Sequence, residues 1–406
     1  MRILHTSDWH LGKTLEGHSR LPEQEAFLEE LIQIADEEDV HLILVAGDIY
    51  DHSNPPAAAE KLFYSAAKKL SKDGQRPIIA IAGNHDSPEG LTAASPLAWE
   101  HGIILLGTPK SVAPKGRYRN YEIHKAGQGF IELSIGEERL VAITLPYPSE
   151  KRLNEIISME GDEDLLQASY SQRIGALFQE LSAHFRVDTI NLLISHLYMV
   201  GGEESDSERQ IQMGGSMAVE ASLLPPAQYI ALGHLHRPQV VGKMAYYSGS
   251  PIQYSKSEIH YSKSVYIIDI EAGGDPLVRP VHLRNYKPIE VWRCPSIQDA
   301  IQRCEEEADK TAWVYLEIET SRVLTNEEIR TLRDLRKDIV EIRPILTGEG
   351  DTRGEIQNPL DLDIMELFST FYLHEKGAPP REELVDMFAQ IIGQEEDGDE
   401  ADHIED

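Results

Sequence analysis

The sequence predicts an α/β fold of four layers, in which two facing β-sheets lie between outer helices (α/β/β/α). The first reason is that short apolar runs alternate with longer amphipathic stretches over the first two thirds of the chain. The second is that the runs are four to six residues long and contain many β-branched residues, which is typical of buried strands. They comprise residues 2–6, 41–46, 77–82, 140–144, 190–195 and 229–232.

Three of the intervening stretches have apolar residues at helical spacing, and we expect each to form a helix that covers a sheet. They are residues 22–38, 57–70 and 165–185. Residues 115–136 alternate in polarity and contain glycines, so we expect a hairpin at the edge of a second sheet. Residues 244–270 also favour β-structure.

A boundary is expected near Asn285, because a compact β–α–β–α–β pattern follows it. The pattern covers residues 289–292, 297–307, 313–319, 326–337 and 340–346. The predicted organisation is a main domain (1–284), a small α+β capping domain (285–348), a linker with two C-terminal helices (349–394) and a disordered acidic tail (395–406).

The two C-terminal segments, residues 362–372 and 381–392, are amphipathic and are separated by a Gly-Ala-Pro-Pro sequence. Their apolar faces have two interpretations. They fold back on the core, as most such faces do, or they present side chains to a groove or coiled coil of a partner. The candidates for such a contact are Phe368, Phe371, Met387 and Phe388.

Composition excludes several classes of protein. The 406 residues have a formal net charge of −31, which argues against binding nucleic acid by bulk charge alone. The two cysteines, Cys294 and Cys304, cannot form a disulfide framework or a cysteine-type zinc site, which favours a reducing compartment. The sequence contains neither an apolar run long enough to span a membrane nor a signal peptide, so we expect a cytoplasmic protein.

Five strand-like runs are followed at once by potential metal ligands. These are Asp8 and His10, Asp48, Asn84 with His85, His196, and His234 with His236. The carboxyl ends of strands in an α/β sheet meet at one crevice, so we expect these side chains to converge there. Each i, i+2 pair would face one cation if its backbone were extended. The glycines at 47, 83 and 233 would let the chain bend and let a substrate or ion approach.

Two aspartates, one asparagine and four histidines are too many ligands for one zinc ion and suit two adjacent ions. Imidazole and carboxylate donors without thiolate favour Mn²⁺, Fe²⁺, Co²⁺ or Zn²⁺. Asp48, in the middle of the set, is the natural bridging ligand. Two such ions about 3.5–4 Å apart activate water and hold a phosphoryl centre, and they would give this acidic chain one local positive site.

Each ligand taken alone has a structural explanation, because a single buried histidine is usually a hydrogen-bonded core residue. The ordered combination DxH, GD, GNHD, SH and GHLH, each closing an apolar run, favours a metal centre instead. Two other functions stay open. A small-molecule phosphodiesterase or phosphatase would need no accessory domain or C-terminal helices. A metal-free scaffold would have lost ligands, and all seven are present.

These motifs resemble the calcineurin-like metallophosphoesterase superfamily. The segments TSDWHLGK, VAGDIYD, AGNHDSPE, ISHLYMVGG, ALGHLHRPQ and YYSGSPIQYS resemble more closely the nuclease subunits of bacterial SbcCD complexes, and this similarity covers residues 1–346. The resemblance implies a first ion held by Asp8, His10 and His236 and a second held by Asn84, His196 and His234, with Asp48 bridging. It implies that His85 stabilises the transition state or protonates the leaving 3′ oxygen.

One position departs from the pattern. Some relatives have a second catalytic histidine three residues after the bridging aspartate, where this chain has Asp51. His52 is one place off and is not assigned a catalytic role.

The resemblance also implies substrates, partners and location. The expected activity is that of a Mn²⁺-dependent 3′–5′ exonuclease on double-stranded DNA and an endonuclease on single strands and hairpins, acting in DNA repair, recombination and replication. An SbcC-type, SMC-like ATPase subunit would bind the C-terminal helices and use the ATP, since this chain has no GxxxxGK[ST] motif. A homodimer within a heterotetramer, associated with the nucleoid, is implied by the family.

Two further features have both a functional and a structural interpretation. Lys115, Arg117 and Arg119, interleaved with Tyr118 and Tyr121, would track a DNA backbone or form an ordinary hairpin surface. Arg237 would contact a phosphate or form an exposed salt bridge. The Gly249-Ser250-Pro251 turn is expected to pack beneath the metal site without taking part in the chemistry.

Overall fold

The computed structural model describes residues 1–153, 169–208 and 217–346, together with residues 365, 367–369, 371–372, 379–381, 384–385 and 387–389. The chain divides into two compact units, Met1–Pro288 and Ile289–Asp406. The boundary predicted near Asn285 lies close to this division, and the finer four-part organisation remains a prediction. Within the described residues, no helix combines the length and the apolar character needed to cross a membrane.

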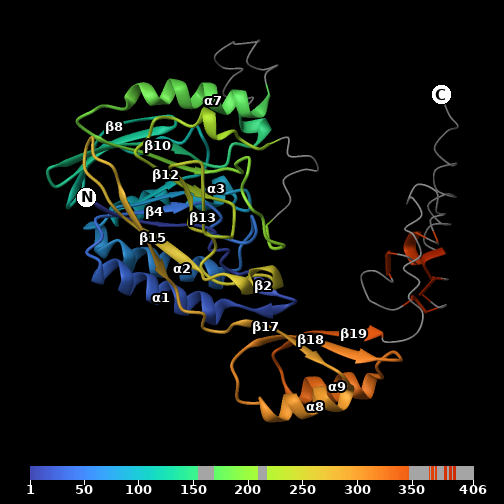
Figure 1. Ribbon diagram of the computed structural model, residues 1–406. Helices are drawn as coiled ribbons and strands as arrows, with labels where there is room; N and C mark the ends of the chain where they lie inside the picture. Colours follow the sequence, from blue (N-terminus) through green and yellow to red (C-terminus); the bar gives the residue numbers. More distant parts are fainter. Residues whose placement is uncertain are drawn as a thin grey trace, which may run out of the picture. The chain divides into compact units, whose positions relative to one another are not determined.

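Two sheets form the centre of the first unit, and the six predicted strands are shared equally between them (Figure 1). The first sheet has the order β16-β15-β1-β4-β5-β6. Its parallel strands are β1 (Arg2–Thr6), β4 (Leu42–Ala46), β5 (Ile78–Ile81) and β6 (Ile103–Leu106). Two antiparallel strands, β15 (Ser264–Asp269) and β16 (Leu277–His282), extend it at one edge.

The second sheet has the order β13-β14-β12-β11-β10-β9-β8-β7. Its parallel centre consists of β10 (Glu138–Leu145), β11 (Ile190–His196), β12 (Tyr229–Gly233) and β14 (Ala245–Tyr247), with β13 (Gln239–Val241) antiparallel beside β14. The hairpin predicted at one edge is found there as β7 (Gly116–Arg117), β8 (Tyr121–Gly127) and β9 (Phe130–Ile135). A separate two-stranded sheet joins β2 (Thr14–Leu15) and β3 (His18–Ser19).

The β-structure predicted for residues 244–270 is only partly correct. Strands β14 and β15 lie at its two ends but belong to different sheets, and a short 3-10 helix, η4 (Lys256–His260), lies between them. The intervening chain crosses from one sheet to the other, and its polar residues Ser250, Gln253 and Glu258 are buried.

Helices cover the outer faces of both sheets. α1 (Leu21–Glu37) and α2 (Ala57–Leu70) pack on the first sheet, and α7 (Tyr170–Leu181) packs on the second (Figure 1). Residues 165–168 of the predicted third helix lie outside the described residues, and α7 starts after the capping box of Ser169 and Gln172. The short helices are α3 (Pro88–Thr92), α4 (Ser95–Glu100), η1 (Lys72–Gly74), η2 (Ser182–His184) and η3 (Ala221–Leu223).

Continuous apolar strands are needed because each central strand is buried on both faces. In β4, Leu42, Leu44 and Ala46 point into the core between the two sheets. Ile43 and Val45 point to the other side, into the core beneath α1 and α2. The predicted four-layer α/β/β/α arrangement is therefore confirmed.

The second unit contains the predicted β–α–β–α–β pattern as a parallel three-stranded sheet. Its elements are β17 (Ile289–Cys294), α8 (Ile297–Glu306), β18 (Trp313–Thr320), α9 (Asn326–Leu335) and β19 (Ile339–Leu346). Figure 1 shows α8 and α9 on one face of this sheet. Ser296 and Thr325 cap the two helices by accepting hydrogen bonds from backbone N–H groups.

The C-terminal segments are helical at many of their described residues. The rings of Phe368 and Phe388 stack with centroids 3.9 Å apart, which brings the two segments into contact. Phe371 and Met387, two of the four predicted contact residues, are 63% and 57% exposed. The acidic tail lies outside the described residues.

Arg336 joins the loops of the second unit and is only 2% exposed. Its guanidinium donates hydrogen bonds to the backbone carbonyls of Glu307 and Lys310 and lies 4.9 Å from the centroid of the Trp292 ring. Replacing it with methionine removes a buried guanidinium and leaves these partly buried carbonyls without its donors, so Arg336→Met should lower the free energy of unfolding by about 3 kcal/mol. Urea denaturation followed by tryptophan fluorescence measures this change.

The matched control is Arg330→Met, because Arg330 is 83% exposed and pairs with Asp334 at 3.7 Å. This change should alter the stability by less than about 0.5 kcal/mol. Equal losses of unfolding free energy in the two variants would show that the hydrogen bonds of Arg336 contribute no more to stability than an exposed ion pair does.

Candidate metal centre

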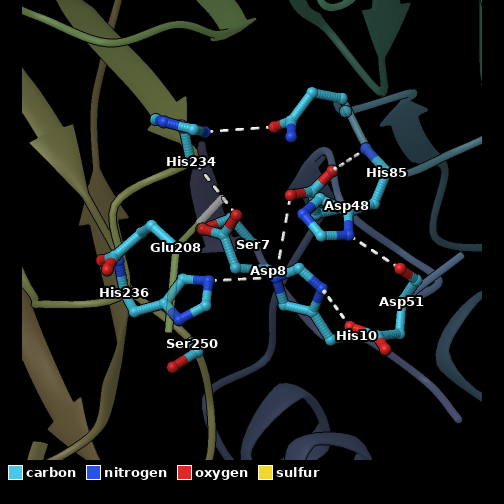
Figure 2. A network of polar contacts seen from close by, with 12 residues as sticks. Ser7, Asp8, His10, Asp48, Asp51, His85, Glu208, His234, His236 and Ser250 are labelled. Atoms are coloured by element: carbon cyan, nitrogen blue, oxygen red, sulfur yellow. Dashed lines mark hydrogen bonds and ion pairs between the residues drawn. The ribbon is translucent and has the colours of Figure 1, made fainter. Parts of the chain in front are cut away.

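The predicted ligands converge, although they come from strand ends of both sheets (Figure 2). Among the described residues, three groups have potential ligand atoms within 4.8 Å of one another, and one of them consists of His10, Asp51 and His85. The other two contain predicted ligands alone and are called the first and the second group: Asp8 with His10 and His236, and Asp48 with His196 and His234. All six side chains are at most 3% exposed. Asn84 joins the second group, since its Oδ1 lies 2.9 Å from His196 Nε2 and 3.1 Å from His234 Nδ1.

Asp48 lies between the two groups. Its Oδ2 is 3.7 Å from His10 Nε2 in the first group and 3.4 Å from His196 Nε2 in the second. Its Oδ1 accepts a hydrogen bond of 2.9 Å from the backbone N–H of His85. One carboxylate oxygen is therefore directed at both groups, which is the placement that a bridging ligand requires.

The backbone around the site is not extended as the reasoning from i, i+2 pairs assumed. Asp8 and His10 nevertheless lie in one group, as expected, whereas the expectation is wrong for His234 and His236. Asp8, His10 and Asp48 have φ values of 54°, 45° and 49°, in the left-handed region. The strands end before these residues, and the turns redirect each side chain separately. His234, with φ of 109°, and His236 accordingly belong to different groups and do not face one cation together. Such strained conformations are typical of functional sites.

The glycines serve the packing of the site more than the approach of a ligand. A Cβ on Gly83 would lie 2.0 Å from Asp48 Oδ1, and one on Gly233 would lie 1.9 Å from the carbonyl oxygen of Ala46. Gly47 has φ of +90° and would clash with His196. The two sheets touch here through strand ends that have no side chains in the way.

Hydrogen bonds set the orientation of two imidazoles. His196 Nδ1–H donates to the carbonyl of Ala46 at 2.9 Å, which leaves Nε2 as the nitrogen that faces the second group. His85 Nδ1–H donates to the carbonyl of Asp51 at 2.7 Å. His85 lies edge-on to His10, with ring centroids 4.8 Å apart, and contacts both Asp48 and Asp51 from the edge of the site.

The electrostatics favour cations at the site. Burial lowers the pKa of His10 to about 3, so its ring stays neutral and keeps a lone pair for a metal. Burial raises the pKa of Asp8 to about 6. Burial would also raise the pKa of Asp48, but His196 outweighs it and holds that pKa well below its ordinary value. Burial opposes protonation of His196, yet Asp48 raises the pKa of this imidazole to about 9.

The raised pKa of His196 corresponds to a protonated ring that balances the charge of Asp48, and a divalent ion would take the place of that proton. The ring nitrogens His10 Nε2 and His236 Nε2 also approach to 3.0 Å. Nitrogen and carboxylate donors directed at the same small space fit a pair of divalent ions.

Sequence reasoning missed several buried residues that support the site. Asp51 contacts His10 Nδ1 at 3.4 Å and Lys13 at 3.0 Å. Asp86, the last residue of the GNHD motif, accepts backbone hydrogen bonds from Ile49, Tyr50 and Gly83 and ties two loops together. Glu258 and Lys263 lie behind His236, in a stretch whose polar composition suggested nothing but a loop or strand.

Of the remaining predicted residues, His52 and Arg237 lie at the periphery of the site and Ser250 is buried beside His236. His52 is 74% exposed, with Nε2 3.1 Å from Asp51 Oδ2. Arg237 forms an ion pair with Glu203, which is the structural interpretation. The turn at Ser250 packs against His236, since the Ser250 N–H donates to the His236 carbonyl at 3.2 Å.

The basic–aromatic cluster forms part of the β7–β8 edge. Lys115, Arg117 and Arg119 are exposed, whereas the rings of Tyr118 and Tyr121 stack with centroids 4.9 Å apart and pack toward the core. The structure is that of a hairpin surface, and contact with DNA remains a hypothesis.

Two family models match the chain. Calcineurin-like phosphoesterase matches residues 1–238, and the domain described as type 5 capsule protein repressor C-terminal domain matches residues 285–376. The D subunit of the SbcCD nuclease of Bacillus subtilis (strain 168) is 42% identical over 98% of this chain and 100% of its own length. The protein of the same name from Rhodobacter capsulatus is 34% identical over 88% of this chain and 89% of its own.

Two solved structures are similar to this chain over most of their own length. A protein of Thermus thermophilus has a TM-score of 0.36 and 13% identity and covers 70% of this chain and 99% of its own. A dimetal phosphatase from Danio rerio has a TM-score of 0.35 and 12% identity, with coverages of 68% and 98%. By its sequence relatives and its family models, the chain belongs to the calcineurin-like phosphoesterase family and, within it, to the D subunits of SbcCD nucleases.

Proposed function

We propose that this nuclease is a Mn²⁺-dependent DNA phosphodiesterase with two ions. Asp8, His10 and His236 would hold the first ion, and Asn84, His196 and His234 the second, with Asp48 shared. The observation that carries the proposal is the position of Asp48, whose Oδ2 lies 3.7 Å from His10 Nε2 and 3.4 Å from His196 Nε2. Nitrogen and oxygen donors without thiolate suit Mn²⁺.

The ions, when bound, supply Lewis acidity and neutralise the charge on the scissile phosphate. The protein's own residues orient the groups that would act on the phosphate. His85 keeps Nδ1–H on the carbonyl of Asp51 at 2.7 Å, so Nε2 is the nitrogen left to face the phosphate. In its protonated form this nitrogen donates to the transition state or to the leaving 3′ oxygen. The backbone N–H of His85 holds Asp48 at the same time, which couples the acid to the bridging ligand.

The proposed substrates are duplex ends, degraded from 3′ to 5′, and single-stranded or hairpin DNA, cut internally. Support comes from the relatives, which are named as SbcCD nuclease subunits. A chain of net charge −31 needs a local positive site for a polyanion, and two divalent ions provide one. The proposed domains would divide the work, with residues 285–348 restricting access to residues 1–284.

The test is cleavage of end-labelled linear duplex, hairpin and single-stranded DNA in Mn²⁺, compared with hydrolysis of a simple aryl phosphodiester. Shortening from the 3′ end and cutting of hairpins are expected, and chelation should stop both. Hydrolysis of the aryl diester without DNA cleavage would favour a small-molecule phosphodiesterase. Fewer than one ion per chain after Mn²⁺ loading would favour a metal-free scaffold.

The proposed partners are an SbcC-type ATPase subunit and a second copy of this chain, which would form a heterotetramer. The C-terminal helices would bind the ATPase, because Phe371 and Met387 expose large apolar side chains at 63% and 57%. The stacked rings of Phe368 and Phe388 would hold the two segments together.

Replacing both Phe371 and Met387 with glutamate should abolish co-purification with the ATPase subunit, because charge cannot enter an apolar groove without a large desolvation cost. Hydrolysis of the aryl diester should be unchanged. Val187→Glu is the matched control, since Val187 is 90% exposed in the other unit. Normal co-purification of the double variant would exclude these helices as the docking site.

A further inference from the structure

A row of polar side chains lies behind His236. His236 Nδ1 is 2.5 Å from Ser207 Oγ, and the Ser207 hydroxyl in turn donates to Glu258 Oε1. Glu258 forms an ion pair with Lys263. These three residues, Ser207, Glu258 and Lys263, are here named the His236 relay, and none of them ligates either ion in the proposed function.

The ion pair of the His236 relay is buried, and Ser207 is half-buried. The side chains of Glu258 and Lys263 are 0% and 6% exposed, and His236 is 1% exposed. Buried charges are costly unless they are paired and fully hydrogen-bonded. Here Lys263 Nζ also donates to the carbonyl of His236 at 2.9 Å and to Ser250 Oγ at 2.7 Å. The ion pair therefore holds the backbone of His236 as well as its ring.

The donors and acceptors allow one direction of hydrogen bonding. An ammonium only donates and a carboxylate only accepts, so the Ser207 hydroxyl must give its proton to Glu258. The free lone pair of Ser207 then accepts from His236 Nδ1–H. In the neutral ring this hydrogen bond leaves Nε2 as the nitrogen that would bind the first ion, and it lies 3.0 Å from His10 Nε2.

A second carboxylate holds the same histidine from the loop that contains Ser207. Glu208 Oε1 accepts the backbone N–H of His236 at 2.6 Å, and Glu208 lies beside His236 in Figure 2. Glu208 Oε2 also accepts the backbone N–H of Ser205 at 2.6 Å. The ring and the backbone of His236 are thus both tied to residues 205–208, in a different part of the sequence.

The two groups of ligands differ in this respect. His196, in the second group, donates Nδ1–H to a neutral carbonyl, that of Ala46. His236, in the first group, is connected through a hydroxyl to a buried carboxylate. A carboxylate behind an imidazole increases its basicity and fixes its tautomer.

We propose that Ser207, Glu258 and Lys263 are positioning residues that set the affinity of the first ion by holding His236 in the Nδ1–H tautomer. This inference rests on the proposed two-ion function. It assigns a role to residues 205–208 and 258–263, which are neither proposed metal ligands nor the proposed acid, His85.

The decisive variant is Ser207→Ala in the full chain. Titration with Mn²⁺ by calorimetry should show binding of one ion weakened about 10–100-fold and binding of the other unchanged. The electron paramagnetic resonance signature of a coupled Mn²⁺ pair should appear only at higher Mn²⁺ concentration. In the metal-free protein, ¹⁵N NMR should show His236 changing from the Nδ1–H form to a tautomer mixture. Ser207→Thr, which keeps the hydroxyl, should restore all three readouts.

The matched control is Ser257→Ala, because Ser257 Oγ contacts Ser255 Oγ and the N–H of Asp206 but not His236. This variant should bind both ions normally. A double-mutant cycle with His236→Ala checks that Ser207 acts through His236, since Ser207→Ala should have no further effect on Mn²⁺ binding once the His236 imidazole is absent.

The outcomes separate the two proposals. Wild-type protein that binds fewer than two ions would overturn the proposed function. Wild-type protein that binds two ions, together with a Ser207→Ala variant that binds both equally well, would overturn the role of the His236 relay alone. If Glu258→Gln weakens the same ion as Ser207→Ala, the relay extends to the buried ion pair. Normal binding in Glu258→Gln would exclude Glu258 from it.

Discussion

Replacing Asp48 with asparagine should reduce Mn²⁺-dependent phosphodiester hydrolysis by about 1000-fold or more and prevent binding of two ions together. The shape of the side chain is kept, but the charge that lies between the two groups of ligands is lost. Asp48 Oδ2 is within 3.7 Å of His10 Nε2 and within 3.4 Å of His196 Nε2, so one substitution affects both groups. A loss of several kcal/mol in the transition state corresponds to an effect of this size.

The measurements are hydrolysis of an aryl phosphodiester and the Mn²⁺ content after loading and desalting. Asp188→Asn is the matched control, because Asp188 is 62% exposed and precedes β11 at the end of the strand away from His196. It should retain two ions and full activity. An Asp48→Asn protein that still holds a coupled pair of ions would rule out the bridging role.

Replacing His85 with leucine should lower kcat by about 100- to 10,000-fold and leave metal binding intact. The imidazole is held by the Asp51 carbonyl at 2.7 Å. It is not among the proposed ligands, although its ring lies with His10 and Asp51 in a third group of potential ligand atoms. The backbone N–H of residue 85, which donates to Asp48, remains in the variant. The chemical step should therefore suffer while the ions keep their places.

His52→Leu is the matched control, since His52 is a neighbouring histidine that is 74% exposed. Its activity and metal content should match those of the wild type. Parallel titrations with Mn²⁺ and single-turnover kinetics separate binding from chemistry. Loss of an ion from His85→Leu would mean that His85 is a ligand, and loss of activity in His52→Leu would give the second catalytic histidine a place in this chain.

The sequence was sufficient for the architecture because apolar patterns report burial directly. β4 alternates between two cores, and both sides of it are apolar, so its run of buried residues was visible. The ligands were visible for a related reason, since each follows such a run. The family resemblance divided them into two sets, and the structure brings each set together.

Other features could not be read from spacing. His234 and His236 suggested a pair facing one cation, but the backbone at His234 has φ of 109°, and the two rings turn to different groups. The local pattern also did not predict which strands pair, because β14 and β15 are close in sequence yet belong to different sheets. Long-range packing decides both the orientation of these rings and the pairing of these strands, and the periodicity of the sequence does not predict long-range packing.

The order of residues along the chain was enough for the α/β class, for the residues that end the central strands and for the prediction that those residues bind divalent cations. Folding in three dimensions was needed to place Asp48 between two groups and to bring Ser207, Glu258 and Lys263 behind His236. The difference arises because burial of apolar residues produces a regular pattern of apolar residues along the sequence. Polar contacts between distant loops depend on where folding brings single side chains, and they produce no such pattern.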